Sequence, residues 1–385
     1  MKPNPTVRSR PAAHSAGFTV IEVVIALFVL VLVLVTMLAL FDASNKMARA
    51  QIHIADLQQS LRVGQNEIVR MTRMAARGWV INRNGWQVTD QVKVTNNVSN
   101  SAFVDGSSTA ELKILPGTDV LRIRGVIAGS VFEPTNPSGV FLEPRLRLET
   151  SSPSGVKQDL EEIKRARDEG NAFRILLVSR QGEVSSADAN VQSLNPASGT
   201  VTDATIDYDA ATAVPAKWVQ EGHPIAITGI IEEYAFYVRE NGGQPRLSMA
   251  RFKPGTNLPY GGTAANLRQD IADDFLDLQV ALAIDKYTDT NGDTAIDEKD
   301  HGNHVIDADE WFYATIGSPP PPVLGTQGDL MFLRINTLAR TQGQDFKYVA
   351  PALTIIEDHI PAPEDDAARR HRRRFLQTVV DLRNM

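Results

Sequence analysis

Residues 17–27 read GFTVIEVVIAL and place a single carboxylate, Glu22, at the start of a long apolar run. From Val23 to Phe41 the run holds no charged residue, and together with residues 18–22 it is long enough for a helix to cross a bilayer. An ionised side chain in hydrocarbon costs roughly 3 kcal/mol even on lenient insertion scales. A simple membrane anchor has no use for such a residue. The stretch therefore predicts a second role for Glu22 besides anchoring.

The residues that precede the apolar run are basic. Lys2, Arg8 and Arg10 occur among the first seventeen residues, and no acidic residue does. Positive charge keeps that side of a membrane segment cytoplasmic, so the rest of the chain is expected on the other side. A secretory signal would have a shorter apolar core followed by a small-residue cleavage site. The pattern beyond Phe41 continues as helix instead, which predicts a retained, single-pass anchor.

A helical stripe continues beyond the apolar run as far as Gly78. Apolar or small residues recur in it at spacings of three and four. They are Met47, Ala50, Ile54, Leu57, Leu61, Gly64, Ile68, Met71 and Ala75. We therefore expect one helix from Phe18 to about Arg77, with a membrane half at 18–41 and an amphipathic half at 42–78. The stripe is expected to pack on the protein's own sheet, and a parallel coiled-coil partner is the alternative.

After residue 78 the pattern changes from helix to strands and turns. Strands are expected at 120–127, 173–179, 224–240, 246–252, 275–284, 329–339 and 374–383. An Asn-Gly pair between the third and fourth of these suits a hairpin turn. Stretches 95–109 and 185–213 are expected to be surface loops, and 157–169 a short solvated helix. The predicted fold class is α+β, with a long N-terminal helix carrying a mainly antiparallel β-sheet head domain at 79–385.

The charge balance disfavours one class of partner. The formal net charge is −7, and an acidic protein is a poor general binder of nucleic acid. No specific nucleic-acid partner is therefore predicted. The densest basic cluster, RRHRRR at 369–374, is interpreted as a charged approach to the last strand, whose exposed edge it would protect. A contact with DNA, lipid headgroups or an acidic neighbour is the alternative for this cluster.

The head shows no recognisable catalytic set. The chain has no cysteine, which excludes disulfides, thiolate metal sites and cysteine nucleophiles. It has no GxSxG, no HExxH and no phosphate-binding glycine loop. We expect no enzymatic activity.

An Asp-rich loop, DTNGDTAIDEKD at 289–300, has the ligand spacing of an EF-hand calcium loop. The oxygen ligands would be Asp289, Asn291, Asp293, the Ala295 carbonyl, Asp297 and Asp300. Thr294 stands at the sixth position, where glycine usually makes the sharp turn. A weaker second copy of this calcium-loop pattern follows with Asp307, Asp309 and Glu310. Calcium is therefore a candidate cofactor of the wider loop 285–310, and a solvated, metal-free acidic loop is the alternative.

The motif Gly17-Phe18-Thr19-Val20-Ile21-Glu22, followed by an apolar helix, resembles the processing site of type IV prepilins. The resemblance implies that residues 1–17 are a cytoplasmic leader, which prepilin peptidase removes by cutting between Gly17 and Phe18. Phe18 would then be N-methylated, and Glu22 would be the fifth residue of the mature chain. In that family the carboxylate pairs with the new amine of a neighbouring subunit. A signal anchor with a chance glutamate is the alternative.

The C-terminal half resembles PilW-type minor pilins. The likeness lies in DLQVALAID, in GDLMFLRINTLART and in the ending RRHRRRFLQTVVDLRNM. It covers 17–41 and 228–385, whereas 80–220 shows none and is interpreted as an insertion.

The resemblance implies a subunit at or near the tip of a type IV pilus that primes assembly with other minor and major pilins. It would start in the inner membrane with its head in the periplasm and end in the pilus at the cell surface. The alternatives are a type II secretion pseudopilin and a membrane-anchored adhesin or binding protein that does not polymerise.

Overall fold

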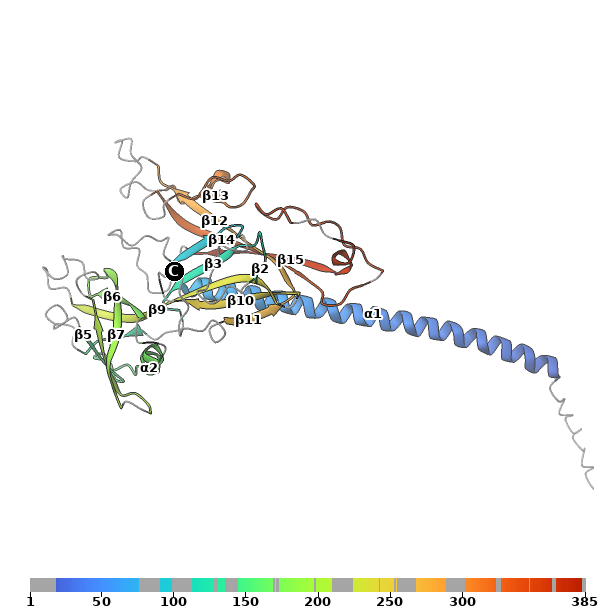
Figure 1. Ribbon diagram of the computed structural model, residues 1–385, viewed down its shortest axis with the longest axis horizontal. Coiled ribbons are helices and arrows are strands. Elements are labelled where there is room, and N and C mark those ends of the chain that lie inside the picture. Colours follow the sequence, from blue (N-terminus) through green and yellow to red (C-terminus); the bar gives the residue numbers. More distant parts are fainter. Residues whose placement is uncertain are drawn as a thin grey trace, which may run out of the picture. The chain divides into compact units, whose positions relative to one another are not determined.

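Figure 1 shows the computed structural model of the chain. The residues it describes are 19–75, 91–98, 113–127, 131–135, 145–168, 170, 173–196, 199–209, 224–241, 243–252, 254, 268–288, 302–322, 327–345, 347–361 and 365–382. Gly17, Phe18 and the loop 289–300 therefore lie outside the described residues. The chain divides into two units, Met1–His53 and Ile54–Met385.

A single helix, α1 (Val20–Ala75), spans both units and confirms the predicted long N-terminal helix. Its apolar half is rich in β-branched residues, which are weak helix formers in water. In hydrocarbon, however, every backbone N–H and C=O group needs a partner, and a helix satisfies them within the segment. A hydrocarbon environment, more than residue propensity, therefore favours a helix in this apolar half.

The larger sheet has eleven strands, all paired antiparallel, in the central order β1-β3-β9-β6-β7-β8-β5. Its strands are β1 (Val92–Thr95), β2 (Lys113–Ile114), β3 (Val120–Gly125), β4 (Val131–Phe132), β5 (Arg145–Glu149), β6 (Phe173–Ser179), β7 (Val184–Asn195), β8 (Asp203–Tyr208), β9 (Ile225–Asn241), β10 (Gln244–Phe252) and β11 (Arg268–Asp273). The long strand β9 connects its two regions (Figure 1). It pairs with β4 and β6 along its first half, and with β2, β3 and β10 along its second.

The smaller sheet has four antiparallel strands in the order β13-β12-β14-β15. They are β12 (Phe275–Lys286), β13 (Trp311–Phe312), β14 (Gly328–Arg340) and β15 (Arg373–Asp381). Two short 3-10 turns, η3 (Ala308–Glu310) and η4 (Ala368–Arg370), precede β13 and β15. The last strand confirms the prediction for 374–383, and the basic run 369–374 does lead into it.

Two large apolar clusters hold the head together. One joins the C-terminal part of α1 to both sheets, through Leu61 and Ile68 of the helix, Phe236 of β9 and Phe275 of β12. The other lies under β5 to β8 and includes Ile163 of a second helix, α2 (Glu161–Asp168). Residues between 131 and 208 thus share a core of their own with the first half of β9. Whether 80–220 is an insertion stays a prediction.

The structure corrects three expectations. The stretch 185–213, expected as a loop, contains β7 and β8, because small residues such as Ala187 and Ala189 are buried where they pair with β6. The helix within 157–169 exists, but it is not solvated all round, since Ile163 and Ala166 are buried. The stripe on α1 is buried only from Leu57 onward, whereas Met47 is 65% exposed.

Candidate functional site

The N-terminus of α1 is closed by a reciprocal contact between Thr19 and Glu22. The Glu22 backbone N–H donates to Thr19 Oγ1 at 3.3 Å. In return the Glu22 carboxylate accepts from the Thr19 N–H at 3.3 Å and from its hydroxyl at 3.2 Å. This is a capping box, in which a threonine and a glutamate three residues later satisfy two orphan N–H groups of the helix end. Glu22 therefore has a local structural role as well as the predicted assembly role.

The apolar half of α1 is exposed to the surroundings of the chain. An 18-residue window of this helix has a mean hydropathy of 3.3, and none of it is buried inside the protein. Leu38 is 67% exposed and Phe41 is 67% exposed. A large apolar surface of this kind is unfavourable in water at about 25 cal/mol per Å². By length and composition the helix can cross a membrane once.

The last five turns of α1 are fastened to the head. Leu57, Leu61, Ile68 and Met71 are at most 4% exposed. Burial of each such side chain stabilises the fold by about 1.5–3 kcal/mol. Two hydrogen bonds to strand carbonyls support this packing, from Ser60 Oγ to Asp273 O at 3.1 Å and from Gln65 Nε2 to Ile335 O at 3.3 Å.

Gly64 allows α1 to pack closely against side chains of both sheets. A Cβ at this position would lie 2.6 Å from Phe275 Cζ and 2.8 Å from Leu247 Cδ2. Carbon atoms in contact normally stand about 3.5–4.0 Å apart. The stripe of apolar and small residues included Gly64, whereas its buried polar neighbour Gln65 was not singled out. A glycine inside a helical stripe hints at a packing reason, but the pattern does not say which side chains it meets.

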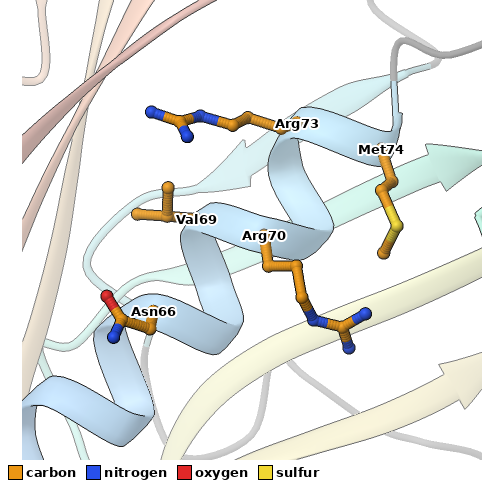
Figure 2. Close-up of a pocket in the computed structure, with 5 residues that line it drawn as sticks. All are labelled: Asn66, Val69, Arg70, Arg73 and Met74. Atoms are coloured by element: carbon orange, nitrogen blue, oxygen red, sulfur yellow. The ribbon is translucent and has the colours of Figure 1, made fainter.

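A pocket of about 500 Å³ lies beside the end of α1 (Figure 2). Its lining residues come from one side of the helix: Asn66, Val69, Arg70, Arg73 and Met74. The Arg70 guanidinium donates from Nε to Glu67 at 3.0 Å, and this hydrogen bond raises the pKa of Arg70 although partial burial opposes it. Among the described residues, this lining holds two arginines and no carboxylate or histidine.

Two adjacent buried glutamates of β9 pair with arginines of neighbouring elements. Glu233 of β9 accepts from Arg122 at 3.2 Å and from Arg124 at 2.8 Å. Its neighbour Glu232, on the other face of the strand, is fully buried and pairs at 2.9 Å with both Arg165 of α2 and Arg251 of β10. A buried charge needs such partners because desolvation is costly. Through these arginines, Glu233 joins β9 to β3, and Glu232 joins β9 to α2 and β10.

Asp119 joins the larger sheet to the smaller one. Its carboxylate accepts from Asn97 N at 2.8 Å and from Val280 N of β12 at 2.7 Å, and its own N–H donates to Leu278 O at 2.9 Å. Burial raises the pKa of Asp119 well above its ordinary value, while these two hydrogen bonds oppose the rise and the nearby charges of Asp358 and Asp277 add to it. The side chain lacks a cationic partner among its hydrogen bonds to described residues. Asp119 therefore joins the two sheets through hydrogen bonds to the backbone of β12.

The predicted calcium ligands Asp289, Asn291, Asp293, Ala295, Asp297 and Asp300 all lie outside the described residues. The structure describes Asp307, Asp309 and Glu310 of the weaker second copy of the calcium-loop pattern. Asp309 pairs with Lys286 Nζ at 2.7 Å, and this hydrogen bond lowers the pKa of Asp309. Glu310 accepts from Lys286 N at 2.8 Å and from Asp307 N at 2.9 Å. Among the described residues, no group of three or more His, Cys, Asp or Glu side chains is arranged to hold a metal ion.

Comparisons with known proteins add little to this geometry. No family model matches the chain, and no curated protein matches its sequence. Among solved structures, one weak neighbour is a type IV-like pilin from Thermus thermophilus. It is 11% identical, with a TM-score of 0.20, over 58% of this chain and 94% of that one. A TM-score this low does not establish a common fold, so the functional inference rests on the chain's own residues.

Proposed function

We propose that this chain is a minor pilin of a type IV pilus. Prepilin peptidase would cut it between Gly17 and Phe18, and it would enter the filament at or near the tip and prime assembly. The observation that carries the proposal is the position of Glu22. This carboxylate lies in the first turn of an exposed helix that is long enough to cross a membrane and that continues to Ala75. The role is structural, with no catalysis.

The contacts of Glu22 within its own chain are compatible with a second partner. The two hydrogen bonds that its carboxylate accepts from described residues are long and come from uncharged donors, at 3.3 Å and 3.2 Å. The new amine created at residue 18 of a neighbouring subunit would be a cationic donor. Charge-assisted hydrogen bonds are shorter and roughly twice as strong as neutral ones. Within its own chain the Glu22 carboxylate has only neutral donors in the capping box. A neighbour's cationic amine would therefore compensate its negative charge in the membrane.

Two other functions share the same helix. A type II secretion pseudopilin would use the same processing and docking, and the genes beside this one would separate the two. A membrane-anchored adhesin or binding protein would keep the helix but never polymerise. Mass spectrometry of the mature N-terminus tests the class directly. A chain that starts at N-methylated Phe18 is expected, and an intact Met1 start would contradict both the pilin and the pseudopilin.

Substitutions at the capping box separate docking from helix capping. Glutamine can replace glutamate in a capping box, but it carries no charge. Glu22→Gln and Glu22→Ala are therefore both expected to abolish incorporation into sheared filaments. Thr19→Ala is the matched control, because it weakens the cap by about 0.5–2 kcal/mol and keeps the carboxylate. It should be incorporated.

The opposite pattern would refute assembly through Glu22. If Glu22→Gln enters filaments normally while Glu22→Ala and Thr19→Ala do not, the carboxylate serves only as a cap. Immunoblotting of membranes checks that each variant is present in equal amounts.

A further inference from the structure

Strand β15 forms an open edge of the smaller sheet. It pairs with β14 over nine positions, from Arg373 opposite Arg340 to Asp381 opposite Phe332, with no register shift. An unbroken register means that no bulge bends this edge away from a new strand. Among the described strands, β15 has no neighbour on its other side.

The hydrogen bonds at both ends of β15 show which of its residues face outward. Thr341 N donates to Arg372 O at 2.8 Å, and Leu382 N donates to Met331 O at 2.9 Å. Residues directed toward β14 alternate with residues directed away from it. The even-numbered positions therefore bond to β14. The backbone N–H and C=O groups of Phe375, Gln377 and Val379 point to the open edge.

The middle of this edge lacks the usual protection against strand pairing. Phe375 is 49% exposed and Val379 is 48% exposed. Lysine, proline and bulges are the common means of blocking an edge, and none occurs from residue 375 to 380. The basic run before the strand is engaged elsewhere: Arg369 donates to Ala350 O at 3.0 Å, and Arg372 pairs with Asp345 at 2.9 Å. Arg373, at the start of the strand, donates from Nη2 to Ala368 O at 3.3 Å. Protection of the edge by the basic run stays a prediction.

The sequence of β15 is complementary to itself when two copies run antiparallel. If Gln377 lies opposite its own copy, Phe375 faces Val379 twice and Arg373 faces Asp381 twice. We propose that β15 pairs antiparallel with β15 of a second copy of this chain, centred on Gln377. Each outward-facing pair then exchanges two backbone hydrogen bonds. Both apolar contacts and both opposite-charge contacts lie on one face of the joined sheet.

This pairing is a two-fold, self-complementary interface. A parallel arrangement would place arginine opposite arginine and aspartate opposite aspartate, which is unfavourable. The charges at the two ends of the strand therefore favour the antiparallel register, in which Arg373 would add a contact with Asp381 to the hydrogen bond that it makes within its own chain. The pairing does not depend on whether the chain polymerises through α1, so it stands apart from the proposed pilin function.

Disulfide trapping of the full-length chain in membranes tests this register, because the chain contains no cysteine of its own. Opposite Cα atoms in a hydrogen-bonded pair are about 5.5 Å apart, within the range that a disulfide spans. Gln377→Cys is therefore expected to give a covalent dimer on mild oxidation. Phe375→Cys alone would lie about 14 Å from its own copy, since four residues of strand separate them. Phe375→Cys and Val379→Cys should each remain monomeric, whereas the double variant should cross-link.

Charge exchange gives an independent readout. Asp381→Arg is expected to abolish the dimer band of the Gln377→Cys chain, because it places arginine opposite arginine. Adding Arg373→Asp should restore it. Equal cross-linking at all three cysteine positions, no dimer from Gln377→Cys in a chain that melts normally, or a cross-link to a different protein would each overturn the pairing.

Discussion

Substitution of Gly64 tests how closely the anchor helix is seated on the head. Alanine in a helix interior is about 1 kcal/mol more favourable than glycine, so Gly64→Ala would stabilise an unpacked helix. Here the new methyl group would lie 2.6 Å from Phe275 and 2.8 Å from Leu247, and both side chains are fully buried. Overpacking of this kind costs about 1–3 kcal/mol. The two effects leave a net loss of up to about 2 kcal/mol.

Gly64→Val enlarges the effect, because it adds two more carbon atoms and gains less helix propensity. The expected order of stability is glycine, then alanine, then valine, with the valine loss at about 3 kcal/mol. Thermal unfolding of the purified full-length chain in detergent, followed by near-UV circular dichroism, measures the order. Val63→Ala is the matched control: this neighbouring side chain is 49% exposed, so its loss should leave the melting temperature unchanged or slightly raised. A rise in stability for Gly64→Ala would refute the close packing of α1 on Phe275 and Leu247.

Two further predictions concern acid sensitivity and calcium. Burial alone would raise the pKa of Asp270, but hydrogen bonds from Arg239, Ser248 and Arg246 outweigh it and lower the pKa to about 2. The folded value lies below the unfolded one, so this stabilisation is present above pH ~4 and is lost as the pH falls toward ~2. In Asp270→Asn the free energy of unfolding, measured in urea, should fall less steeply between pH ~4 and ~2 than in the native chain. An equally steep fall in the variant would contradict this role of Asp270. For the loop 289–300, millimolar calcium should raise the melting temperature, EDTA should reverse the rise, and Asp293→Ala should abolish it. Asp366→Ala is the control outside the loop, and no calcium response in the native chain would support the solvated-loop alternative.

Local patterns predicted the helix and most of the long strands. The apolar run and the spacing of three and four in the following stripe predicted α1, because helix formation depends on neighbours one turn away. Alternation and turn residues likewise predicted β3, β6, β9, β10, β12, β14 and β15. The capping box could also have been found from Thr19 and Glu22 alone, since it is a contact across three residues.

Strands with weak local signals were missed. In β7, buried Ala187 and Ala189 stand where valine or isoleucine would mark a strand, so the segment looked like a loop. Pairing with β6 on one side and β8 on the other decides its conformation. The buried stripe on α1 was predicted to begin too early, at Met47, for a related reason. The spacing of Met47 shows which face of the helix it lies on, but not whether another element packs against that face.

The sequence by itself determined the membrane-length helix, its capped start at Glu22 and the α+β order of elements, because each depends on residues near one another in the chain. Only the tertiary structure decided that Gly64 meets Phe275 and Leu247, that Asp119 clamps two sheets, and that β15 has an open edge. These features join residues that are far apart in sequence, and no local propensity encodes such contacts. Burial of apolar surface brings these segments together. The neighbours that each glycine or polar side chain then meets determine its space and its hydrogen bonds.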